Sequence, residues 1–164
     1  MWPDNRLTEL FGIEVPVIQA PMAGAGGLDM AAAVGEAGGL GSLACAPLDI
    51  QGLDDLMKAS ARATGRPLNF NFFSHQPPEV NEAKDAAWLG SMSDYFGDVG
   101  LPLPKTLSMN GLQPFDEARC RIVEQHAPAV VSFHFGLPSP DLVARVKATG
   151  AKLVSSATTV AEAL

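Results

Sequence analysis

Two spacings of apolar residues alternate along this chain. Short apolar runs that are rich in β-branched or aromatic residues and end at glycine or proline predict buried strands, whereas apolar residues at every third or fourth position predict helices. The runs that predict strands are 15–22, 40–46, 68–73, 129–135 and 152–156. Strands separated by helices favour a parallel sheet with crossover connections.

The helices expected between these strands carry their own start signals. Side chains that can accept a hydrogen bond from a first-turn amide stand at Asp29, Asp49, Ser139 and Thr159, which are residue types favoured at helix N-caps. Pro140 then occupies the first helical position, where its missing N–H costs nothing. The helices predicted in this way are 29–37, 49–64, 114–125 and 139–149, with a first turn after Thr159.

The alternation is interrupted between the third and fourth strands. Residues 74–113 are proline-rich at both ends and only weakly helical between them. Long connections without strong periodicity are usually functional or disordered. We expect an insertion at about 74–113 that covers the C-terminal end of the third strand, and a surface excursion without a role is the alternative.

The order of the elements predicts an α/β fold, the (β/α)₈ TIM barrel. Such a barrel needs roughly 250 residues, and the 164 residues here hold only about its first five strands. We therefore interpret residues 1–164 as the N-terminal portion of a single TIM-barrel domain. A fragment of this kind is expected to be inactive by itself, because its sheet is not closed.

The amino-acid composition excludes some classes of binding partner. The formal net charge is −7, and no cluster of Lys and Arg marks a nucleic-acid surface. No apolar run reaches the roughly 18 residues of a membrane helix, and the first residues lack the pattern of a signal peptide. Two cysteines without ligand spacing indicate reduced thiols. We expect a cytoplasmic protein whose partners are small molecules and, in a homo-oligomer, further copies of itself.

The fourth strand places a histidine among apolar neighbours. Strand side chains alternate between two faces, so His134 and Ser132 point to the side opposite Phe133. In the third strand the same alternation turns Asn69 and Asn71 away from its apolar side chains. Further polar or special side chains expected on this interior face are Gln19, Pro21 and one of Ser155 and Ser156.

This interior set favours a site, because active sites of barrels lie at the C-terminal ends of the strands. A core histidine satisfied by a neighbour is the alternative for His134. Gly24, Gly26 and Gly27 do not form a dinucleotide fingerprint, and they serve either a tight turn or the close approach of a flat ligand. Neither His75 nor His126 has the spacing of a metal ligand to an acid or cysteine, so no metal site is expected.

Four segments together resemble one family, the nitronate monooxygenases, formerly called 2-nitropropane dioxygenases. The segments are Val17-Ile18-Gln19-Ala20-Pro21-Met22-Ala23-Gly24, Ala37-Gly38-Gly39-Leu40-Gly41-Ser42, Asn69-Phe70-Asn71-Phe72-Phe73 and Val131-Ser132-Phe133-His134-Phe135-Gly136-Leu137-Pro138. The resemblance implies an FMN-dependent TIM barrel that oxidises alkyl nitronates or nitroalkanes with dioxygen to a carbonyl compound and nitrite. It covers the N-terminal part of that barrel, since later family motifs have no counterpart in these residues.

The resemblance also implies roles for single residues. Ala20, Pro21, Met22 and Asn71 match positions that contact the flavin, and His134 matches the proposed catalytic base. An imidazole titrates near neutral pH and can remove a proton from the carbon next to a nitro group. The flavin would carry the redox step.

Two other functions stay open from the sequence. An enoyl-thioester reductase or an NAD(P)H:quinone reductase of the same barrel type would share the first-strand motif and use a reduced nicotinamide. A non-catalytic half-barrel that only pairs with itself is the second alternative. The natural substrate, the use of NAD(P)H and the oligomeric state are not determined by these residues.

Overall fold

The computed structural model describes residues 2–77, 79, 81–107 and 113–164, which form two compact units. The first unit consists of residues 1–75 and 112–164, and the second of residues 76–111. In the second unit, α4 (Glu82–Ser91) begins at Asn81, whose side chain accepts a hydrogen bond from the Lys84 amide at 3.0 Å. A short helix, α5 (Ser93–Asp98), follows. Whether this unit is an insertion that covers the third expected strand stays a prediction.

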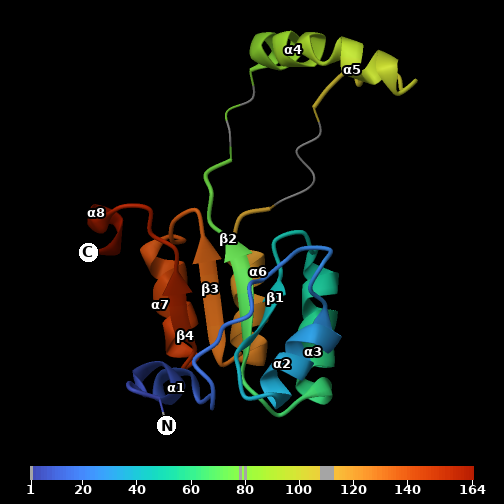
Figure 1. Cartoon of the computed structure of the whole chain (residues 1–164). Helices are drawn as coiled ribbons and strands as arrows, with labels where there is room; N and C mark the ends of the chain where they lie inside the picture. Colours follow the sequence, from blue (N-terminus) through green and yellow to red (C-terminus); the bar gives the residue numbers. More distant parts are fainter. Residues whose placement is uncertain (1, 78, 80, 108–112) are drawn as a thin grey trace. The chain divides into compact units, whose positions relative to one another are not determined.

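The first unit is built on a parallel sheet (Figure 1). Its strands are β1 (Gly41–Ala44), β2 (Leu68–Phe73), β3 (Val130–His134) and β4 (Lys152–Ser155), and they lie side by side in chain order. Consecutive parallel strands joined by helices are the arrangement found in a (β/α)₈ barrel. The predicted fold class is therefore confirmed.

The helices of the first unit lie close to their predicted positions, except α1, which was not predicted. Their bounds are α1 Arg6–Phe11, α2 Leu28–Glu36, α3 Ile50–Ala63, α6 Glu117–His126, α7 Pro140–Ala148 and α8 Val160–Ala163. The longest helix in the described residues, α3, has 14 residues. A bilayer-spanning helix needs about 20, so none of the described helices could cross a membrane.

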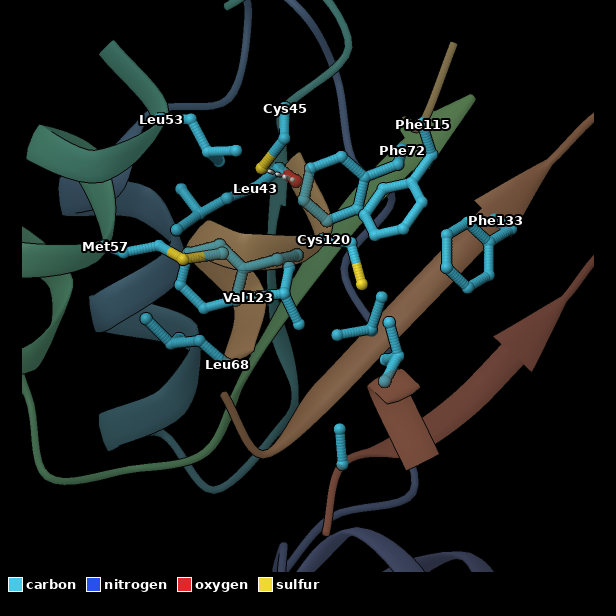
Figure 2. Packing of buried hydrophobic residues seen from close by; sticks show 14 of the residues in the cluster. Leu43, Cys45, Leu53, Met57, Leu68, Phe72, Phe115, Cys120, Val123 and Phe133 are labelled. Atoms are coloured by element: carbon cyan, nitrogen blue, oxygen red, sulfur yellow. Dashed lines mark hydrogen bonds between the residues drawn. The ribbon is translucent and has the colours of Figure 1, made fainter. Parts of the chain in front are cut away.

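One face of the sheet carries the main apolar core. Side chains from alternate strand positions pack there against α2, α3, α6 and α7, as Figure 2 shows for most of them. At the centre, the ring of Phe115 stands edge-on to Phe72 and Phe133, with centroids 4.9 and 5.1 Å apart. The fully buried members include Leu43, Leu53, Met57, Phe72, Cys120, Val123, Val131, Phe133 and Val146.

The opposite face is apolar where the strands begin. There Phe11 and Ile13, at and after the end of α1, pack with Leu40 and Val130 in a second, smaller cluster. Further along the strands this face carries buried polar side chains, namely Ser42, Asn69, Asn71 and Ser132. The alternation read from the sequence therefore holds in β2 and β3.

The first of the five expected strands is reduced to a single bridge. Ile18 pairs with Leu40 in parallel, through hydrogen bonds from the Leu40 amide to the Val17 carbonyl and from the Gln19 amide to the Leu40 carbonyl, each 2.9 Å. The segment contains Pro16 and Pro21, which have no N–H to donate. Prolines on both sides of the bridge keep this segment from pairing along its whole length.

Two of the expected helix caps differ from the prediction. Gly27, not Asp29, is the N-cap of α2, so Asp29 lies inside the first turn. Ser139 is the N-cap of α7, yet its side chain makes no capping hydrogen bond. Asp49 does cap α3, with its Oδ1 accepting from the Gly52 amide at 2.7 Å.

The difference between the caps at Asp49 and Ser139 can be measured. We expect Asp49→Ala to lower the free energy of unfolding by about 1 kcal/mol, because the Gly52 amide loses its acceptor. Ser139→Ala is the matched control and should cost clearly less, since no bond is lost there. Denaturant titrations of both variants would give the two values, and equal losses would contradict the cap assignment.

A cluster of charges joins α6 to α7. Arg145 donates to Glu117 at 2.6 Å and to Glu124 at 2.7 Å. These hydrogen bonds hold the pKa of both carboxyl groups below the usual 4.5. A carboxylate with a lowered folded pKa stabilises the protein above its unfolded pKa, and that contribution is lost as the pH falls through the folded value.

Arg145→Met should therefore destabilise the protein at neutral pH, and the difference from the wild type should shrink as the pH falls below about 4.5. Arg62→Met, at an exposed arginine on α3 with no ion pair in the described residues, serves as the control. Chemical unfolding at several pH values would test this. A difference that stays constant down to strongly acid pH would show that the carboxylates of Glu117 and Glu124 are not responsible.

Candidate functional site

A hollow of about 900 Å³ lies at the C-terminal ends of β3 and β4. Its lining comes from the loops that follow these two strands and from the last turn of the chain. The residues around it are His134, Phe135, Gly136, Leu137, Ser155, Ser156, Ala157, Thr158, Glu162 and Ala163. The hollow thus opens beside the histidine that the sequence singled out.

His134 is the last residue of β3 and is half-buried. Its ring lies beside those of Phe73 and Phe135, with both centroid distances 6.3 Å. Among the described residues, no side chain forms a hydrogen bond with the ring. Aromatic packing therefore orients this imidazole and leaves its nitrogens free for a ligand, so the interpretation as a satisfied core histidine finds no support in these contacts.

The turn after His134 is conformationally strained. Phe135 has a φ of +65° and Gly136 a φ of +98°, and a left-handed non-glycine residue costs of order 1–3 kcal/mol. The Phe135 ring is 65% exposed, yet it stands edge-on to Phe73 at 4.8 Å. This turn ends β3 immediately after His134 and keeps the imidazole at the rim of the sheet.

His75 belongs to the same aromatic group, which the sequence did not reveal. Its ring centroid lies 6.3 Å from that of Phe73 and 6.5 Å from that of Phe135. The parallel register explains this position, because it pairs Phe73 with His134. A residue two positions after Phe73 must then lie near the end of β3.

Asn71 and Ser132 are paired across β2 and β3. The side-chain amide of Asn71 donates to the Ser132 hydroxyl at 2.9 Å and to the Ser132 carbonyl at 3.4 Å. Asn71 is 2% exposed. No described residue donates to its carboxamide oxygen, so this oxygen is the part of Asn71 that can still accept a hydrogen bond from a ligand.

A second polar pair lies one rung nearer the start of the strands. Asn69 donates to the Ser42 hydroxyl at 3.1 Å, which gives Ser42 a place in the interior face that the sequence did not single out. Within the described part of the chain, the buried carboxamide oxygen of Asn69 and the buried hydroxyl of Ser74 have no partner. Buried polar atoms of this kind are usually satisfied in the native protein by a protein group or an ordered water.

The segment Ala20–Met22 follows the bridge at Ile18 and turns away from the sheet. The carbonyl of Met22 accepts hydrogen bonds from the Ala25 and Gly26 amides at 3.3 and 2.8 Å. Gly24 has a φ of +76° in this turn, so the glycines do serve a tight turn. The structure brings Asn71 and His134 to one face of the sheet, and in the described residues no hydrogen bond joins either of them to Ala20–Met22.

Burial and hydrogen bonding determine the state of two further titratable side chains, Cys45 and Glu162. Burial raises the pKa of the Cys45 thiol to about 12, so this cysteine is not a nucleophile near neutral pH. Glu162 lines the hollow, and hydrogen bonds from the amide and hydroxyl of Thr158 lower the pKa of its carboxyl group. No group of three or more potential metal ligands occurs in the described ranges.

Comparison with known sequences gives one consistent family. The family model described as nitronate monooxygenase matches residues 4–164. A nitronate monooxygenase of Paraburkholderia phytofirmans is 40% identical over 161 residues, which make up 97% of this chain and 44% of that protein. Another, from Pseudomonas aeruginosa, is 36% identical over 97% of this chain and 46% of its own length. The chain therefore spans a little under half the length of these relatives.

Solved structures agree with the family and the fold. A nitroalkane oxidase from Streptomyces ansochromogenes superimposes with a TM-score of 0.80 at 32% identity, over 96% of this chain and 44% of that one. FabK from Thermotoga maritima gives a TM-score of 0.67 over 96% of this chain and 39% of that one, but at 22% identity this likeness shows the fold alone. The family match covers nearly every residue of the chain and is supported by relatives more than 30% identical. The chain belongs to the nitronate monooxygenase family of oxidoreductases.

Proposed function

We propose that the full-length protein containing these residues uses FMN and dioxygen to oxidise alkyl nitronates or nitroalkanes to a carbonyl compound and nitrite. The observation that carries this proposal is the position of His134, whose ring is free of hydrogen bonds to described side chains and lies at the rim of a hollow at the C-terminal end of β3. The family membership indicates the reaction, and His134 is positioned to act as its base.

The interior face fits the ring end of a flavin. The carboxamide oxygen of Asn71, to which no described residue donates, can accept a hydrogen bond, and an isoalloxazine edge carries both donors and acceptors. Ala20, Pro21 and Met22 would contact the flavin through backbone that leaves the sheet. The hollow beside His134 is lined by no Lys or Arg, so these residues offer no cationic partner for the phosphate.

His134 would act on the carbon next to the nitro group. A neutral nitroalkane must lose a proton there before it can be oxidised, and a free imidazole at the rim of the sheet can take that proton. A preformed nitronate has already lost it. Bound FMN would supply the redox chemistry, while Phe73 and Phe135 hold the imidazole in place.

The reductase alternatives have less support. The likeness to FabK shows only a shared fold, whereas the sequence relatives with substantial identity are nitronate monooxygenases. Nitrite release without consumption of NAD(P)H would separate the two chemistries. Nothing in the geometry favours a non-catalytic half-barrel over an enzyme.

The proposal includes a cytoplasmic location and small-molecule substrates. Its support is the pair of buried free thiols, Cys45 and Cys120, since free cysteines are the rule where the compartment is reducing. Self-association into a homo-oligomer is part of the proposal as well, and size-exclusion chromatography of the full-length protein would test it.

The role of His134 can be tested by separating the two substrates. His134→Asn should lower kcat/KM for a neutral nitroalkane by about 10²–10⁴-fold, the usual contribution of a general base. Turnover of the preformed nitronate should be largely kept. His126→Asn is a matched control, because His126 pairs with Asp54 away from the hollow. Equal rates of the His134 variant and the wild type on both substrates would rule out His134 as the base.

A test of Asn71 must separate an effect on folding from an effect on cofactor binding. Asn71→Ala should weaken FMN retention or shift the flavin spectrum, because the carboxamide oxygen is lost. Ser132→Ala removes one of the two acceptors of the Asn71 amide and leaves the carboxamide oxygen of Asn71 in place. It should therefore have a smaller effect. Equilibrium dialysis and absorbance spectra of both variants give the comparison. If Ser132→Ala reduced flavin binding as much as Asn71→Ala, the bond between the strands, not a flavin contact, would explain the loss.

A further inference from the structure

The edge of β1 that faces residues 15–22 carries backbone N–H and C=O groups that need hydrogen-bond partners at regular intervals. In a parallel ladder, alternate residues direct both their N–H and their C=O to the same neighbouring strand. Leu40 is bonded in this way to Val17 and Gln19. The next residue with this orientation is Ser42, whose N–H and C=O would normally meet the carbonyl of Gln19 and the amide of Pro21.

Pro21 cannot complete that rung, because proline has no amide hydrogen. The side chain of Gln19 takes its place. Its Oε1 accepts a hydrogen bond from the Ser42 amide and its Nε2 donates to the Ser42 carbonyl, both at 3.3 Å. One carboxamide therefore satisfies both backbone groups that the interrupted ladder would have left unpaired.

The surroundings of this carboxamide are shaped to hold it. A Cβ added to Gly26 would stand 3.1 Å from Nε2 of Gln19, so a larger residue would press on the amide. On the other side, Asn69 donates to the Ser42 hydroxyl at 3.1 Å. Because the Gly26 amide is also bonded to the Met22 carbonyl, the glycine turn closes over the Gln19 side chain.

We propose that Gln19 is a positioning residue, whose carboxamide replaces a missing rung of the ladder and thereby releases the backbone of Ala20–Met22 from the sheet to face the cofactor. This inference rests on the proposed FMN-dependent function. In an ordinary ladder Gln19 and Pro21 would direct their backbone groups toward β1, but Pro21 has no N–H to donate. With the Gln19 carboxamide bonded to Ser42, the segment does not need to continue along β1. In the described residues the amides of Ala20 and Met22 and the carbonyls of Ala20 and Pro21 form no backbone hydrogen bond, so these groups can contact a flavin.

The first test needs no cofactor. In Gln19→Ala the Ser42 amide loses its acceptor, so its hydrogen exchange should speed up at least tenfold, while the amides that pair β2 with β3 keep their protection. Gln19→Glu keeps the size of the side chain and can still accept from the Ser42 amide, but its carboxylate cannot donate to the Ser42 carbonyl. Unchanged exchange at Ser42 in Gln19→Ala would overturn the inference.

The second test measures FMN affinity in the full-length protein. Gln19→Ala and Gln19→Glu should each raise the Kd for FMN roughly three- to tenfold, the effect of about one hydrogen bond. Protonation of the new carboxyl group restores a donor, so the deficit of Gln19→Glu relative to the wild type should shrink as the pH falls through the pKa of that group. The deficit of Gln19→Ala should not.

The glycine offers an independent check. Gly26→Ala should raise the Kd for FMN in the same direction as Gln19→Ala, whereas Gly65→Ala, where a Cβ meets nothing within 4 Å, should leave it unchanged. Wild-type affinity in both Gln19 variants would refute the positioning role although FMN binds. A wild-type protein that binds no FMN would instead refute the proposed function, and the exchange of the Ser42 amide would still decide whether Gln19 holds the segment.

Discussion

Packing of one face of a parallel sheet against helices is the interaction on which the rest of this structure depends. Every second side chain of β2 and β3 enters the core beneath α3, α6 and α7, where Phe115 stands edge-on to Phe72 and Phe133. Each residue that enters the core fixes the direction of its neighbours, because strand side chains alternate. The opposite face is therefore free to carry polar groups without loss of the main core.

The strand register determines which polar side chains meet on the polar face. Parallel pairing sets Asn71 opposite Ser132 and Asn69 opposite Ser42, and each pair forms a side-chain hydrogen bond. A buried amide without a partner would be costly, so these pairs keep the face polar and stable at the same time. The same register sets Phe73 beside His134 and so defines the packing of the candidate base.

Departures from regular structure gather around the candidate site. The first segment leaves the sheet after one bridge, and the chain after β3 turns through a left-handed phenylalanine. Local irregularities of this kind are tolerated where a rigid sheet surrounds them, and they commonly mark functional positions.

Much of this arrangement was determined by the sequence alone. Apolar periodicity located β1 to β4 and the main helices, since burial on one face requires a regular spacing, and alternation predicted that Asn69, Asn71 and His134 share the other face. Four motifs together indicated the family, which the comparisons confirmed. The roles of single residues in binding and catalysis stay predictions.

Only the tertiary structure decided which polar groups are already paired and which are left for a ligand. The replacement of a ladder rung by Gln19, the bond between Asn69 and Ser42, and the approach of His75 to Phe135 each join residues far apart in the chain. Such contacts depend on strand register and on the path of loops, and local residue patterns contain neither. The cap of α2 shows the same limit, because both Gly27 and Asp29 can begin a helix and the structure has Gly27 as the N-cap.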